Sequence, residues 1–300
     1  MTDYTLVTSS DSAVEWTAGT SVVADDVTIN GKVTLKGDTN LILCDGASLT
    51  IGGDGFDTLC IRGNYTLSIY GQTNQTGKLT ATTTSNAVVT KNLNIYGGDI
   101  TVAGNNGFAI NDYTNIYGGT VNAAASYSGG IAIRGGLGLT IIGGNVTAAN
   151  TAGGCALFSI NNISLGWTDP DDSISITGSV AVGESTGVIE IAGGQYLTDG
   201  NGGLYSGTFP LTENGYYYYA NDLANKTLVP AYKVTFTADD IDDIYMGADR
   251  TGNDKVTAPE VPMNANNEIV LWYADDTFAT PADFSQPITS DTTFYGKWTP

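Results

Sequence analysis

The chemistry open to this chain is limited first by a residue type that it lacks. The 300-residue sequence contains no histidine, and its 31 aspartates and glutamates outnumber the 11 lysines and arginines. Without histidine there can be no Ser-His-Asp or Cys-His nucleophile pair and no histidine zinc site, and the commonest general base is missing. What remains is carboxylate-based glycoside hydrolysis or calcium-assisted lyase chemistry.

A glycosidase needs two carboxylates about 5 to 9 Å apart on one face of the protein. The sequence shows no clear pair of this kind. Asp99 and Asp112 fall at different corners of one predicted coil turn, and Asp169, Asp171 and Asp172 share one local turn in "WTDPDDS". We therefore predict no catalytic residues and no enzymatic activity.

A polysaccharide-degrading enzyme is the alternative. A hydrolase would show a cleft with two facing acids around Asp112, Glu184 or Glu190. A lyase would need an arginine or lysine base beside an acidic calcium cluster. Arg62 and Arg134 are the only arginines of the predicted coil, about three turns apart, and neither has an acidic group nearby in sequence.

Acid-rich segments offer the hard oxygen ligands that calcium prefers. They are "DGFD" at 54–57, "DPDD" at 169–172 and "DDIDD" at 239–243, and none has EF-hand spacing. We expect no cofactor, because acidic loops on an acidic protein are usually solvated. If calcium binds at all, the expected ligands are those of the third segment: Asp239, Asp240, Asp242 and Asp243.

Three tyrosines recur at the same point of a repeat and predict a ligand-binding surface or a structural ladder. Tyr70, Tyr96 and Tyr117 each follow an inward-pointing isoleucine, so they should point outward. On consecutive turns they would stand about 4.8 Å apart. Asn94 and Asn115 point outward beside them. Rings next to amides are typical of carbohydrate-binding faces, whereas the structural alternative is cross-strand stacking alone.

The elements that position these tyrosines come from an internal repeat. "LSIYGQ", "LNIYGG", "TNIYGG" and "LTIIGG" place Ile69, Ile95, Ile116 and Ile141 at steps of 26, 21 and 25 residues. Each unit holds short strands with alternating apolar residues, and a period of this length made only of strands indicates a solenoid. We predict an all-β solenoid, a single-stranded parallel β-helix with three strands per turn. The alternative is a β-sandwich of hairpins.

Composition divides the chain into three regions. We expect an N-terminal cap over residues 1–26 that contains Trp16, a parallel β-helix over 27–230, and a small β-grasp-like domain over 231–300. Glycine thins out after residue 230 and prolines become frequent. The three cysteines, Cys44, Cys60 and Cys155, have unrelated spacings, so no disulfide framework is expected, although a Cys44–Cys60 bridge stays open.

The last seventy residues resemble a known family, the Listeria–Bacteroides repeat, or internalin B-repeat type of module. The residues that carry the resemblance are "YKVTF" at 232–236, Pro262, "LWYAD" at 271–275 and "DFSQPITSDTTFYGKW" at 283–298. The resemblance implies a small β-grasp-like unit of bacterial cell-surface and secreted proteins. The preceding coil is similar in pattern to glycine-rich β-helices on surface proteins of gut bacteria.

Charge and hydropathy restrict the possible binding partners. A net charge of −20 repels nucleic acid and anionic membranes, and no apolar run approaches the length of a membrane span. The start "MTDYTLVTSS" shows no secretory signal. We predict a secreted or cell-surface bacterial protein that acts in adhesion or carbohydrate binding, with a polysaccharide or host glycan as partner. A protein partner of the C-terminal module and a purely structural stalk are the other options.

Overall fold

The computed structural model describes residues 3–53, 55–251 and 255–300. These residues form an all-β structure without an α-helix, in which the one helical element is the short 3-10 helix η1 (Asn221–Leu223). The chain divides into two compact units. The first, called the coil unit here, comprises Met1–Ala192 and Thr208–Thr227, and the second, the C-terminal unit, comprises Gly193–Gly207 and Leu228–Pro300.

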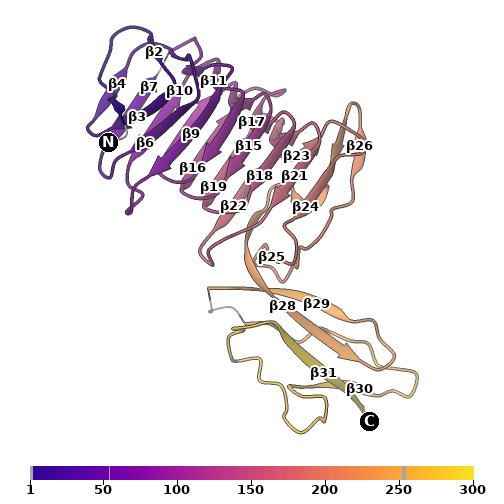
Figure 1. The fold of residues 1–300 in the computed structure, drawn as a ribbon. Coiled ribbons are helices and arrows are strands. Elements are labelled where there is room, and N and C mark those ends of the chain that lie inside the picture. The colour runs from indigo at the N-terminus through magenta and orange to yellow at the C-terminus, as the bar shows by residue number, and fades with distance from the viewer. Residues whose placement is uncertain (1–2, 54, 252–254) are drawn as a thin grey trace. The chain divides into compact units, whose positions relative to one another are not determined.

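The coil unit is a parallel β-solenoid of about seven turns, and its strands stack in three sheets (Figure 1). The first sheet contains β1 (Tyr4–Leu6), β3 (Gly19–Val23), β6 (Thr39–Leu43), β9 (Thr66–Gly71), β12 (Asn92–Ile95), β15 (Tyr113–Ile116), β18 (Gly138–Ile141), β21 (Asn162–Leu165) and β24 (Val188–Ile191). The coil strands of the second sheet are β4 (Val27–Ile29), β7 (Ser48–Gly52), β10 (Lys78–Thr82), β13 (Asp99–Gly104), β16 (Thr120–Ala125), β19 (Asn145–Asn150) and β22 (Ser173–Thr177).

The third sheet begins with parallel strands and ends with a hairpin. Its parallel strands are β2 (Val14–Trp16), β5 (Val33–Leu35), β8 (Ile61–Arg62), β11 (Asn86–Val89), β14 (Asn106–Ile110), β17 (Ile131–Gly135), β20 (Cys155–Ser159) and β23 (Ser179–Val182). The hairpin of β26 (Thr212–Asn214) and β27 (Tyr217–Tyr219) then pairs antiparallel to β23.

Alternation of apolar and polar residues builds the interior of the coil, because every second side chain of a strand points to the same face. The isoleucines of the repeat pair in register, Ile69 with Ile95, Ile95 with Ile116 and Ile116 with Ile141. All four are fully buried. Burying each such side chain contributes about 1.5 to 3 kcal/mol, so the repeated column is a main source of the coil's stability.

The Gly-Gly pairs form the corners between the first and second sheets. The second glycine of each pair has a positive φ, at +98° for Gly98, +87° for Gly119 and +84° for Gly144. A Cβ on Gly119 would also lie 2.6 Å from the carbonyl oxygen of Gly98, and one on Gly144 would lie 2.4 Å from that of Gly119. Glycine is therefore required both by backbone conformation and by the close stacking of corners.

The C-terminal unit contains a mixed sheet. Its strands are β25 (Leu197–Thr198), β28 (Thr227–Ala238), β29 (Ile244–Asp249), β30 (Ile269–Tyr273) and β31 (Thr292–Thr299). The order is β30-β31-β28-β29, in which β28 and β31 run parallel and the other pairs are antiparallel. The core of this unit gathers around the fully buried Phe236, with Phe294 and Trp272 packed against it.

The prediction of an all-β solenoid followed by a small β-domain is confirmed. The residues that the sequence assigned to a cap, 1–26, contribute β1, β2 and β3. β2 and β3 pair parallel with the coil strands β5 and β6, and β1 pairs parallel with β3. Met1 and Thr2 lie outside the described residues. The segment 193–207, which the repeat pattern assigns to the coil, packs in the C-terminal unit. All three cysteines are free thiols.

Candidate functional site

Tyr70, Tyr96 and Tyr117 form a continuous stack at the corner between the first and second sheets. The ring centroids of Tyr70 and Tyr96 are 4.8 Å apart with an interplanar angle of 8°, and those of Tyr96 and Tyr117 are 5.1 Å apart at 15°. These distances match the spacing of adjacent strands. The stack therefore follows directly from the register that pairs Ile69, Ile95 and Ile116 one position earlier.

The asparagines beside the rings form a second ladder. The amide Nδ2 of Asn115 donates to Oδ1 of Asn94 at 2.9 Å, and Nδ2 of Asn94 donates to the Ser68 hydroxyl at 3.3 Å. The structure thus brings Asn94 and Asn115 together with the three tyrosines on neighbouring turns. Part of the hydrogen-bonding capacity of both amides is used within the ladder.

The orientation of the rings determines what they offer to a ligand. Because neighbouring rings are nearly parallel and stack at the strand spacing, Tyr96 has both faces covered by Tyr70 and Tyr117. Its exposed fraction of 44% must come from the ring edge and the hydroxyl group. A row of upright rings presents polar edges, and the stacking agrees with the structural ladder that the sequence left open beside a ligand-binding surface. Only a ring at the end of the stack, such as Tyr117, has a face that is free of another tyrosine.

Two long corners flank the tyrosine stack. Ile95 and Ile100 are five positions apart in sequence, and this spacing recurs in the two following turns. By contrast, ten positions separate Ile69 from Leu79. The register aligns Leu79 with Ile100, so the additional residues of the first long corner, 72–77, leave the coil as a loop.

The second long corner follows β21. Nine positions separate Leu165 from Ile174, and Ile174 is aligned with the coil through Val146. The additional residues, 166–172, therefore also leave the coil as a loop. The turns that carry Tyr96 and Tyr117 lie between these two loops.

The loop at 166–172 is fixed by a buried carboxylate, Asp172. Its Oδ1 accepts the backbone N–H of Gly144 at 2.7 Å, and its Oδ2 accepts the N–H groups of Thr168 and Asp169 at 2.8 Å each. Hydrogen bonds to a charged acceptor are among the stronger ones in proteins. Asp172 therefore ties the loop to a Gly-Gly corner and is not free for chemistry.

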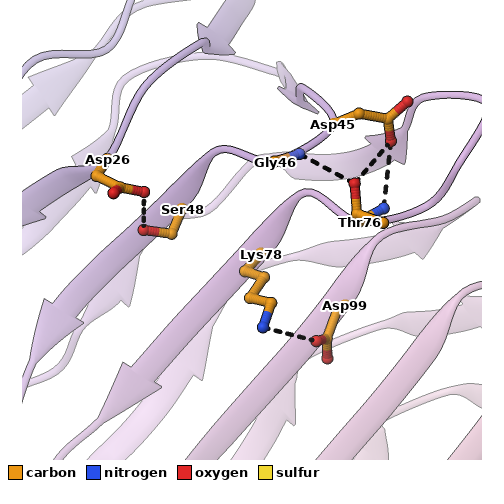
Figure 2. A network of polar contacts seen from close by, with 7 residues as sticks. All are labelled: Asp26, Asp45, Gly46, Ser48, Thr76, Lys78 and Asp99. Carbon is orange, nitrogen blue, oxygen red and sulfur yellow. Dashed lines mark hydrogen bonds and ion pairs between the residues drawn. The ribbon is translucent and has the colours of Figure 1, made fainter.

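The loop at 72–77 is fixed by Asp45 on the preceding turn. Figure 2 shows Asp45, Gly46 and Thr76 in one network, in which the Thr76 hydroxyl accepts from the N–H of Gly46 at 3.0 Å and contacts Asp45 at 3.3 Å. Gln75 then closes the corner, because its Oε1 accepts the N–H of Gly98 at 2.6 Å.

The two loops and the tyrosines enclose a groove of about 480 Å³. We call it the tyrosine groove. Tyr96 and Tyr117 line it together with the glycine corners, Gln75 lies on the side of the first loop, and Asp169 and Asp171 lie on the side of the second. It therefore combines aromatic edges, phenol groups and carboxylates.

Burial in the stack, followed by the neighbouring Tyr70 and Tyr117, raises the pKa of Tyr96. A phenol with a raised pKa stays neutral at physiological pH and keeps its proton as a hydrogen-bond donor. The centre of the tyrosine groove therefore offers a neutral donor and acceptor to a ligand.

The acids considered for metal binding do not form a cluster. Within residues 3–53, 55–251 and 255–300, no group of three or more Asp, Glu, Cys or His side chains is arranged to hold a metal ion. Asp239, Asp240, Asp242 and Asp243 lie between β28 and β29, where Asp243 accepts a hydrogen bond from the Tyr245 hydroxyl at 3.2 Å. Geometry gives the calcium prediction no support there. Asp54, from "DGFD", lies outside the described residues.

The acids of the enzyme alternative lie on different elements. Asp112 is in the turn before β15, Glu190 is on β24 and Glu184 follows β23. Glu184 lines a second groove, on the third sheet. In the tyrosine groove the exposed acids are Asp169 and Asp171, from a segment that the sequence presents both as a local turn and as one of three acid-rich segments. The unequal spacing between inward residues is the signal that would have revealed the two loops.

The comparisons with known proteins concern the C-terminal unit. A family model, the Listeria-Bacteroides repeat domain, matches residues 232–297, which confirms the resemblance seen in the sequence. No curated protein and no solved structure matches the chain. Domains of this family occur in surface proteins, so the match suggests a bacterial surface protein. Among the described residues no helix has the length and apolar character needed to cross a bilayer.

Proposed function

We propose that the protein is a non-catalytic surface protein of a bacterium that binds polysaccharide through the tyrosine groove. The observation that carries the proposal is the meeting of stacked Tyr96 and Tyr117 with two fixed loops in one concave surface. Concave surfaces with aromatic side chains and a few placed polar groups are the usual form of small-ligand sites. The repeat module at the C-terminus supports a role in adhesion.

The charge of the groove favours a neutral polysaccharide. Asp169 and Asp171 line one side of it and no lysine or arginine is among the described residues that line it, so an anionic glycan would meet repulsion in this groove. Sugar hydroxyls can donate to these carboxylates and accept from the phenol groups. A sugar would lie along the exposed edges and hydroxyl groups of Tyr96 and Tyr117, because Ile142 follows Tyr117 in register and lies beyond the end of the stack.

The direct test is a Tyr96→Ser, Tyr117→Ser double variant. Retention on a panel of insoluble neutral polysaccharides should fall about tenfold, because each aromatic contact is worth about 0.5 to 1.5 kcal/mol. Tyr113→Ser is the matched control, since Tyr113 is 50% exposed on β15 but is not part of the stack. Its retention should equal that of the unmodified protein.

Two results would reject the proposal. Unchanged retention of the double variant, together with lower thermal stability, would make the stack purely structural. Release of reducing ends from any polysaccharide of the panel, abolished by Asp169→Asn or Asp171→Asn, would make the groove the active site of a glycosidase.

A further inference from the structure

A second concave surface lies on the outer face of the third sheet, away from the tyrosine groove. The register aligns one outward column across five strands: Arg62 with Val89, Ala109 with Arg134, and Arg134 with Phe158. Arg62 and Arg134 are therefore separated by three strand spacings, roughly 14 Å. The two small side chains between them leave open space above the sheet.

Arg134 lines a groove of about 540 Å³, which we call the arginine groove. In the part of the chain that the structure describes, the guanidinium of Arg134 forms neither an ion pair nor a hydrogen bond, whereas Lys36 pairs with Glu15 and Lys78 with Asp99. An arginine without a partner is notable in a chain where acids outnumber basic residues almost three to one. Its planar group suits bidentate recognition of a carboxylate.

An aromatic wall closes one side of the arginine groove. The ring of Tyr217, on the hairpin strand β27, meets that of Phe158 edge to face at a centroid distance of 5.0 Å. The hairpin packs Phe158 to 5% exposure, whereas Tyr217 keeps 40%. Tyr217 thus supplies a partly free aromatic surface on the same groove as Arg134.

The opposite side of the groove is polar. Nδ2 of Asn106 donates to Oδ1 of Asn86 at 2.7 Å, and Oδ1 of Asn106 accepts the N–H of Ile131 at 2.6 Å. Within the described chain Nδ2 of Asn86 forms no hydrogen bond, so it is a free donor. Glu184, which is exposed and also lines the groove, is an acceptor that lies beyond ion-pair distance of Arg134.

We propose that the arginine groove is a second binding site, specific for a sugar unit that carries a carboxylate. Arg134 binds the carboxylate, Tyr217 contacts the apolar side of the sugar ring, and Asn86 and Glu184 bond its hydroxyls. An uronic-acid oligosaccharide has all of these groups. An acidic peptide would satisfy Arg134 but has no ring hydroxyls to bond to Asn86 and Glu184, so the saccharide is favoured.

The test uses the full chain in calcium-free buffer, with an oligogalacturonate, its methyl ester and a poly-glutamate peptide as probes. Isothermal titration should detect the oligogalacturonate and show at least about tenfold weaker binding of the methyl ester, in which the carboxylate charge is removed. Arg134→Gln should weaken binding by a similar factor without lowering the melting temperature. Arg134→Lys should bind the oligogalacturonate more tightly than Arg134→Gln but more weakly than the unmodified protein.

Arg62→Gln is the matched control, because Arg62 belongs to the same column but does not line the groove. Its affinity should be unchanged. Three outcomes would overturn the proposal: no binding of oligogalacturonate, equal binding of acid and methyl ester, or an equal loss in Arg62→Gln, which would mean general charge attraction. Tighter binding of poly-glutamate would overturn the saccharide assignment. Unchanged binding by Tyr96→Ser, Tyr117→Ser separates this site from the tyrosine groove.

Discussion

The coil unit and the C-terminal unit bury apolar side chains in different ways. In the coil, identical or similar residues stack in columns, so that Ile95 contacts the turn before it and the turn after it. In the C-terminal unit one residue, Phe236, lies within about 6 Å, ring to ring, of Trp272, Phe284 and Phe294. A column distributes stability over many turns, whereas a single cluster concentrates it in a few side chains.

The turns of the two units differ as well. Corners of the coil depend on glycine, because Gly98, Gly119 and Gly144 approach one another at backbone contact. The loop after β30 depends on a side-chain acceptor, because Asp275 binds the N–H groups of Ala279 at 3.1 Å and Thr280 at 2.8 Å. Stacked corners leave no room for a side chain, whereas an open loop needs one to hold it.

The largest effect is expected from Phe236→Ala. Removing a fully buried phenylalanine costs about 3 to 5 kcal/mol, which should unfold the C-terminal unit at moderate temperature. Limited proteolysis followed by mass spectrometry should show cleavage within residues 193–207 and after residue 228, while the coil unit stays resistant. Phe278→Ala, which removes a 36% exposed ring of the same unit, is the control with little effect. Simultaneous loss of the coil would contradict the distinction between the two units.

A smaller effect is expected from Gly119→Ala in the coil. The positive φ costs about 1 to 2 kcal/mol in a residue with a Cβ. The new Cβ would also clash with the carbonyl oxygen of Gly98, and moving the backbone apart adds to the cost, so the free energy of unfolding should fall by about 2 kcal/mol or more. Chemical denaturation measures the change. Gly46→Ala separates the cost of the positive φ from the cost of the clash, because Gly46 also has a positive φ but open space around its Cβ position. Equal losses in both variants would show that corner stacking contributes nothing.

The smallest effect concerns pH and the C-terminal unit. The hydroxyl of Thr277, and then the N–H groups of Ala279 and Thr280, hold the pKa of Asp275 well below its usual range. A depressed pKa contributes stability that is present above the ordinary aspartate pKa, near 4, and is lost as the pH falls through the lower value in the folded protein. Below about pH 4 the melting temperature of this unit should therefore decrease less steeply in Asp275→Asn than in the unmodified protein.

The control for the pH experiment is Asp276→Asn, at the exposed neighbouring position. Its melting temperature should follow the same acid dependence as the unmodified protein. If Asp275→Asn also follows it, the hydrogen bonds to Asp275 do not contribute to the stability of the C-terminal unit.

Much of the coil could be predicted because its determinants are local. Alternation fixes which side chains point inward, and the repeat spacing fixes which residues stack, so Ile95 over Ile69 and Tyr96 over Tyr70 follow from the sequence. The same reasoning locates Asn94 and Asn115 beside the rings. The two flanking loops were also within reach, since ten positions from Ile69 to Leu79 exceed the five of the following turn.

Other features of the sites depended on tertiary packing. No local pattern states that the tyrosine rings stand upright and cover one another, because the side-chain torsions are settled by the neighbouring turns. Nor does the sequence near Arg134 indicate that Tyr217, some eighty residues later, returns in a hairpin to complete its groove.

The sequence by itself thus determined the coil, its register and the family resemblance of the C-terminal region, since short-range periodicity and a closing motif carry that information. Only the tertiary structure decided which surfaces are concave. A groove forms where loops and hairpins from distant turns meet over the same strands, and that meeting depends on contacts such as Asp172 with Gly144 that no repeat pattern records.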